Sequence, residues 1–250
     1  MSNVVKLGRR SFGGIVAGLA AATVLRAPQA VAAAPDGAGA IQDMMAALQA
    51  ARALSCTTDA TFGASVAKDK LKTLGNRSSV VFQRPDSLFI VFGGDGAPDV
   101  QMLINGGEAT LYRLSLGAKT VRKLAPENGA AFAVPGLFIP VLGLLSENVD
   151  KDFFGGVTSV TPIAQGAPDQ PEQTTLAAVM GAGFTGEVWV AKDNGLPTRV
   201  SGTWFGAKGD VAASAVLNLS GWSSEAPVEG AFAVKGLPDA KSVELDALGL

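Results

Sequence analysis

The sequence contains no histidine and a single cysteine, Cys56. Without histidine the chain cannot build a Ser-His-Asp triad, a Cys-His pair, a histidine-containing zinc site or the usual proton shuttle at neutral pH. One cysteine cannot form an internal disulfide, so packing must supply stability. We predict that Cys56 is a small buried hydrophobe and that the protein is not an enzyme and uses neither metal nor cofactor. A catalytic site built on carboxylates or on a Ser-Lys pair remains an alternative.

The first 32 residues have the layout of a bacterial export signal. A twin-arginine pair, Arg9-Arg10, precedes an apolar stretch from Phe12 to Leu25, and Ala30-Val31-Ala32 is a small-x-small cleavage site. The apolar stretch contains glycines and is shorter than the ~20 apolar residues that span a bilayer. We therefore expect residues 1–32 to be a signal peptide removed near Ala32, and residues 33–250 to be one periplasmic domain without a permanent membrane span.

The mature chain has an acidic and evenly scattered charge. Four of the 20 basic residues and no acidic one lie in the signal, which leaves 16 basic against 22 acidic residues, a net charge of −6. A chain of this kind has no basic patch for nucleic acid or for anionic lipid headgroups. Its hydrophobic fraction of 48% fits a globular domain with a real core.

The hydrophobic pattern predicts one helix followed by a strand-rich chain. Apolar residues recur near helical spacing over 41–54, which indicates an amphipathic helix. They are Ile41, Met44, Met45, Leu48 and Leu54. Short β-type runs follow, separated by turn residues such as Asn105-Gly106. The expected strands are 55–67, 78–83, 87–92, 100–104, 108–114, 120–124, 157–164, 174–180, 187–192, 198–205 and 211–222.

One element interrupts the strands. Residues 135–145, here called the apolar segment, are almost wholly apolar but contain two prolines and two glycines. Such a sequence is a poor long helix, so we predict one or two short helical turns. An antiparallel sheet curved around this segment is the simplest architecture.

Two motifs resemble catalytic or cofactor signatures, but their surroundings favour a structural interpretation. Residues 181–186 match the dinucleotide fingerprint Gly-x-Gly-x-x-Gly, yet the following Glu187 to Val190 predict a strand where the fingerprint needs a helix. We expect a glycine-rich hairpin there. Ser65 and Lys68 have the Ser-x-x-Lys spacing, but they end a β-type run and have no partner motifs downstream. We expect a surface turn.

Four segments follow one another in an order and spacing that can be compared with a known family. They are a helix that leads into a polar strand (48–62), a hairpin with Arg84-Pro85 (83–88), a hairpin with Asn105-Gly106 (104–112), and a closing segment with Phe232 and Pro238 (230–240). In order and spacing the chain resembles the LolA/LolB-like superfamily of lipoprotein carriers. Within that superfamily it most closely resembles an uncharacterised family of predicted periplasmic proteins.

The resemblance implies a mainly β (α+β) fold, an unclosed antiparallel β-barrel of about 10–11 strands with an N-terminal helix and an apolar helical lid or plug. In the carriers, the arginine of the Arg-Pro hairpin ties the lid helices down. The matching residue is Arg84, and we predict that its guanidinium caps carbonyl groups of the apolar segment. The apolar run from Leu88 to Phe92 indicates a strand with a helix on one face and a cavity or core on the other. The predicted ligand-binding residues are Phe89, Val91, Leu137, Phe138, Val141, Leu142 and Leu145.

Two functions follow from this reading. The first is a periplasmic binding or carrier protein for a lipid or another apolar molecule. Burial of about a dozen carbons at about 0.8 kcal/mol each gives on the order of 10 kcal/mol without any charged group. The alternative is an envelope protein-interaction or sensing module that uses the half-barrel as a docking surface for an unknown protein partner. The same apolar residues could also simply fill the barrel.

Overall fold

The computed structural model describes residues 37–63, 72–73, 77–93, 99–124, 134, 137–154, 157–163, 174–181, 183–205, 209–234 and 239–249. The predicted export signal, its boundary with the mature domain, and the Ser65-x-x-Lys68 spacing lie outside this part of the chain. Within the described ranges, no helix is long and apolar enough to cross a membrane.

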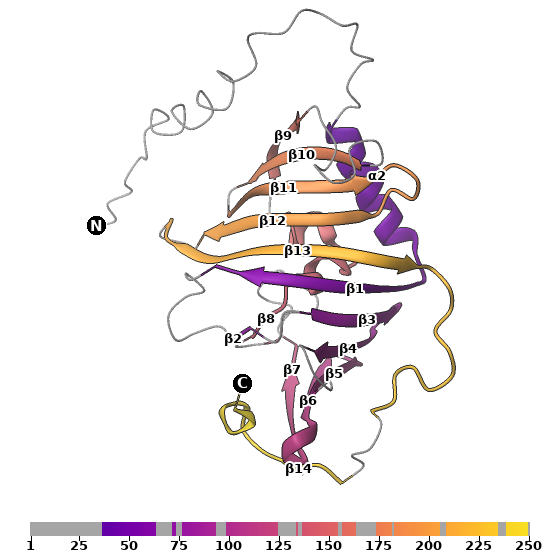
Figure 1. The fold of residues 1–250 in the computed structure, drawn as a ribbon, viewed down its shortest axis with the longest axis vertical. Coiled ribbons are helices and arrows are strands. Elements are labelled where there is room, and N and C mark those ends of the chain that lie inside the picture. The colour runs from indigo at the N-terminus through magenta and orange to yellow at the C-terminus, as the bar shows by residue number, and fades with distance from the viewer. Residues whose placement is uncertain are drawn as a thin grey trace, which may run out of the picture. The chain divides into compact units, whose positions relative to one another are not determined.

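Twelve strands form one sheet in the order β14-β7-β6-β5-β4-β3-β1-β13-β12-β11-β10-β9 (Figure 1). Neighbouring strands are antiparallel except β14 and β7, which are parallel. β14 and β9 are the two edges, so the sheet is unclosed, as predicted. The sequence missed β14, which has two residues. The strands are β1 (Ala53–Phe62), β3 (Arg77–Gln83), β4 (Ser87–Gly93), β5 (Val100–Asn105), β6 (Glu108–Arg113), β7 (Ala118–Lys123), β9 (Val157–Ile163), β10 (Thr174–Gly181), β11 (Phe184–Ala191), β12 (Pro197–Phe205), β13 (Val211–Ser223) and β14 (Lys241–Ser242).

The N-terminal helix, α2 (Gly37–Ala50), packs against β9, β10 and β11. Its buried residues Gly37, Ile41, Met44 and Leu48 recur at three and four positions, which places them on one face. The predicted helix end at Leu54 is wrong. Ala53 and Leu54 already pair with the end of β3, because the β1–β3 ladder begins there and satisfies the backbone that a longer helix would have used.

The apolar segment contains the predicted short helical turn and also a two-residue strand that was not predicted. β8 (Leu137–Phe138) pairs in parallel with β2 (Lys72–Thr73), and α3 (Val141–Leu144) is a single helical turn. A second turn, α4 (Val149–Asp152), follows. Two 3-10 turns, η2 (Leu114–Leu116) and η4 (Leu245–Leu248), complete the described helical elements.

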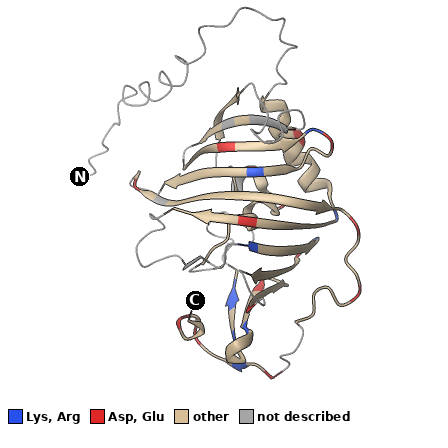
Figure 2. Cartoon of the chain, in the orientation of Figure 1, with Lys and Arg blue, Asp and Glu red and all other residues tan. Residues whose placement is uncertain are grey.

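The two faces of the sheet differ in burial. The inner face carries the core side chains, among them Val80, Ile90, Met102, Val200 and Leu217, and these pack with α2 and the apolar segment in one cluster. The outer face carries the residues that alternate with them. Charged residues are thinly spread over the central strands of this sheet (Figure 2).

The C-terminal part crosses to the far edge of the sheet. Residues 230–234, which resembled a closing strand, form turns instead, and the short β14 pairs with β7 at the edge opposite β9. Arg113 holds the chain end there, since its guanidinium donates to the carbonyls of Leu248 (3.3 Å) and Gly249 (3.1 Å).

The dinucleotide-like motif is a hairpin, as predicted. β10 ends at Gly181 and β11 begins at Phe184, and Met180 pairs with Thr185 across the turn. Gly186 pairs with Gly202 of β12, and the ring of Phe184 lies over both glycines. The two glycines therefore make room for a buried aromatic ring.

Replacing Gly186 by alanine should lower the free energy of unfolding by about 1–3 kcal/mol. The new methyl group would overlap the carbonyl oxygen of Ser201 and the ring of Phe184. Urea unfolding followed by circular dichroism measures the loss. The matched control is Gly93→Ala in β4, where an added Cβ has nothing within 4 Å. Equal stability of the two variants would contradict this packing.

Candidate functional site

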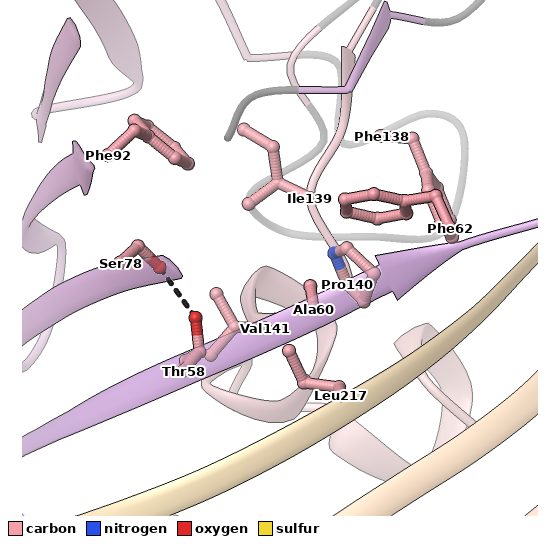
Figure 3. A pocket seen from close by; sticks show the side chains of 10 residues that line it. All are labelled: Thr58, Ala60, Phe62, Ser78, Phe92, Phe138, Ile139, Pro140, Val141 and Leu217. Atoms are coloured by element: carbon pink, nitrogen blue, oxygen red, sulfur yellow. Dashed lines mark hydrogen bonds between the residues drawn. The ribbon is translucent and has the colours of Figure 1, made fainter. Parts of the chain in front are cut away.

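A pocket lies between the inner face of the sheet and the apolar segment (Figure 3). The sheet contributes side chains from β1, β3, β4 and β13, and the apolar segment contributes four consecutive residues. The lining residues are Thr58, Ala60, Phe62, Ser78, Phe92, Phe138, Ile139, Pro140, Val141 and Leu217. None of them carries a charge, so the pocket suits an apolar occupant.

The pocket is small. Its cavity volume is about 20 Å³. A single water needs about 10–15 Å³ on that measure. The apolar segment therefore covers this part of the inner face and leaves room for about one water.

The structure brings the five predicted residues of the apolar segment together over the inner face. Leu137, Val141, Leu142 and Leu145 are buried in the core cluster. Phe138 is half-buried and lies edge-on between two rings, with centroid distances of 6.1 Å to Phe62 and 5.2 Å to Trp204. Phe153, Phe154 and Phe184 continue this aromatic cluster.

The structure separates the two predicted strand residues from that group. In β4 the fully buried side chains are Leu88, Ile90 and Phe92, whereas Phe89 and Val91 alternate to the outer face and are half-buried. Successive residues of a strand point to opposite faces, so the assignment was one residue out of phase. The β4 residue that lines the pocket is Phe92.

A buried polar pair sits in the pocket wall, and the sequence analysis missed it. Thr58 of β1 and Ser78 of β3 are cross-strand partners on the inner face, and their hydroxyl oxygens lie 2.6 Å apart (Figure 3). They are 3% and 7% exposed. The signal was present in the strand alternation, because both residues share a phase with Ala60 and Val80.

Arg84 holds the C-terminal end of α2. Its Nε donates to the carbonyl of Ala51 (3.0 Å) and its Nη2 to the carbonyl of Leu48 (2.9 Å). Carbonyls at the end of a helix lack intrahelical donors, and a cation there also favours the helix dipole. The prediction that Arg84 caps carbonyls of the apolar segment is therefore wrong, because the free carbonyls within its reach belong to α2.

Arg84 also connects α2 to the chain that leaves the apolar segment. Its Nη1 lies 3.8 Å from a carboxylate oxygen of Glu147, and the amide of Gln49 on α2 donates to the carbonyl of Glu147 (3.1 Å). The side chain of Arg84 is 15% exposed and lies over the ring of Phe82. Burial lowers the pKa of Arg84 and the Glu147 carboxylate opposes that shift. Arg84 is thus a half-buried side chain that connects α2 to the chain after the apolar segment.

The described residues offer little for catalysis. Burial raises the pKa of the Cys56 thiol to about 12, so the thiolate that nucleophilic chemistry requires is not populated at neutral pH. Cys56 is a buried small hydrophobe, as predicted. In the described ranges no three His, Cys, Asp or Glu side chains gather in a group that could hold a metal ion.

Several solved structures are similar to this chain. Mycobacterium tuberculosis lipoprotein LppX has 13% identity and a TM-score of 0.45, with 76% of this chain and 97% of that chain covered. The LolA superfamily protein NE2245 from Nitrosomonas europaea has 10% identity and a TM-score of 0.36, with 79% and 97% covered. MucB in the Pseudomonas aeruginosa MucA/MucB complex has 12% identity and a TM-score of 0.40, with 80% and 61% covered.

No curated protein matches the chain. A family model matches residues 38–246, which is most of the described fold, and the description of that family is "Predicted periplasmic protein (DUF2092)". The chain belongs to the DUF2092 family of predicted periplasmic proteins.

Proposed function

We propose that the protein binds and carries a lipid or another apolar molecule on the inner face of its sheet, beneath the apolar segment. The observation that carries this proposal is the position of the segment. A run of apolar residues lies over an uncharged pocket in the sheet face and forms part of its wall. An acyl chain and the segment would bury the same surface, so one can replace the other at small net cost.

The hydrogen bonds of the apolar segment support a movable lid. In its described part, residues 137–145, the backbone bonds outside β8 run to neighbours of the segment itself, such as Leu142 to Ile139 (3.1 Å). The segment pairs with another strand through β8, which pairs with β2 over two residues. The twelve-stranded sheet therefore keeps all its ladders when the segment moves. Local opening needs few broken backbone bonds.

We also propose that the protein is exported to the periplasm. The twin-arginine pair and the Ala30-Val31-Ala32 site suggest that residues 1–32 are removed near Ala32 and that the mature domain works in the periplasm. A periplasmic location suits a carrier, because an acyl chain must be shielded when it moves through water.

A second candidate function rests on the outer face. One cross-strand row runs Val81, Phe89, Leu103, Thr110 and Val121 over β3 to β7. Four of these five side chains are apolar, and Val121 is 49% exposed. Such a row fits a docking surface for a protein partner, as the alternative function requires. Phe89→Glu would disturb docking on this row and leave the inner-face pocket unchanged.

Arg84→Leu should loosen the lid. Loss of two charge-assisted bonds to helix carbonyls should lower the free energy of unfolding by about 1.5–3 kcal/mol and speed ligand release several-fold. Stopped-flow release of a fluorescent fatty ester measures the rate. Arg77→Leu is the matched control, because Arg77 makes an exposed pair with Asp59 in which the side chains are 68% and 50% exposed. Identical release from Arg84→Leu and the parent would refute this role of Arg84.

Filling the pocket should abolish lipid binding. Ala60 is a small side chain in the pocket wall, so Ala60→Phe places a ring where the acyl chain would lie. Val91→Trp adds a large side chain on the opposite face of the sheet and should bind lipid as the parent does. Native mass spectrometry of protein purified from the periplasm measures copurified lipid, and circular dichroism checks the fold. Equal lipid occupancy in folded Ala60→Phe and Val91→Trp would rule out an inner-face site.

A further inference from the structure

The hydroxyl pair of Thr58 and Ser78 is an unusual feature in the pocket wall. Eight of the ten lining residues are apolar, and these two hydroxyls are the only polar side chains among the ten. Both are almost completely buried. A polar group in an apolar wall is unfavourable unless it has partners, so the pair needs an explanation.

The mutual bond uses only part of the hydrogen-bonding capacity of the pair. Each hydroxyl has one O–H donor and two acceptor lone pairs. One O–H is used in the 2.6 Å bond between Thr58 and Ser78, and either oxygen could be its donor. The other O–H and several lone pairs take no part in this bond.

The position of the pair relates it to the lid. In Figure 3 the two hydroxyls lie in the sheet wall beside Val141, and Ile139 lies across the pocket from them. A ligand that displaces the apolar segment from this pocket would lie directly against them. The hydroxyls would then contact the ligand at one point, and apolar side chains would contact the rest of it.

We propose that the Thr58–Ser78 pair binds an uncharged oxygen of the ligand, an ester carbonyl or a hydroxyl, and so selects neutral esters and alcohols over plain hydrocarbons and ionised fatty acids. This proposal rests on the carrier function proposed above. The O–H that the mutual bond does not use donates to an ester carbonyl, and the remaining lone pairs accept from an alcohol. An ionised carboxylate would enter a pocket with no cation among its lining residues and would lose its hydration without compensation.

The same two strands supply a matched control. Thr57 and Ser79 are also cross-strand partners of β1 and β3, and they point to the outer face. The pairs Thr58→Val/Ser78→Ala and Thr57→Val/Ser79→Ala therefore remove the same chemical groups from opposite faces. Removing both partners of the buried pair leaves no unpaired hydroxyl, so the fold should persist, and circular dichroism verifies it.

The experiment measures how well each of three probes displaces a fluorescent hydrophobic dye from delipidated protein at pH 8. The probes have equal chain length and are hexadecane, methyl palmitate and palmitate. The parent and the Thr57/Ser79 variant should prefer methyl palmitate over both other probes. In the Thr58/Ser78 variant, the preference for ester over hydrocarbon should fall by about 5–10-fold, and the affinity for hexadecane should be unchanged.

Two results would overturn the proposal while the carrier function stands. They are an unchanged ester preference in the Thr58/Ser78 variant, or tighter binding of palmitate than of its methyl ester by the parent. Failure of all three probes to displace the dye from the parent would instead overturn the carrier function, and this proposal with it.

Discussion

A sheet that does not close into a barrel leaves its apolar inner face without a partner sheet, and this face must be covered by something else. Here the cover is the apolar stripe of α2 and the apolar segment, which join the strands in one core cluster. Arg84 holds the two covers together, because it bonds the last carbonyls of α2 and pairs with Glu147 beyond the segment. Stability depends on how firmly this cover stays in place, and so do lipid binding and release in the function proposed above.

In the proposed function, the cover and a ligand compete for the same surface. The pocket under the segment is small, and four residues of the segment form part of its wall. Opening exposes apolar surface of both the sheet and the segment, and an acyl chain can cover much of it. Binding of this kind needs neither a charge nor a catalytic group, which agrees with a chain that lacks histidine and has one inert cysteine.

The sequence predicted the fold class, the short turns of the apolar segment and the glycine hairpin, because turn residues and hydrophobic periodicity act locally. It did not predict the acceptors of Arg84, since the distance from Arg84 to the end of α2 depends on tertiary packing. The phase of β4 could have been found. The Arg84-Pro85-Asp86 turn pairs Gln83 with Ser87, so Leu88 and Ile90 share the face of Phe82 and Val80. The hydroxyl pair could also have been found from the strand phase, although Thr and Ser are common on solvent-facing strands.

Photo-crosslinking tests most directly whether an apolar ligand lies on the inner face beneath the apolar segment. A palmitate methyl ester with a diazirine on its chain would be bound to delipidated protein, irradiated, and located by peptide mass spectrometry. A ligand in that position should give adducts on pocket residues such as Phe92, Ile139 and Leu217. Adducts confined to the outer-face row, at Phe89 or Leu103, would contradict it.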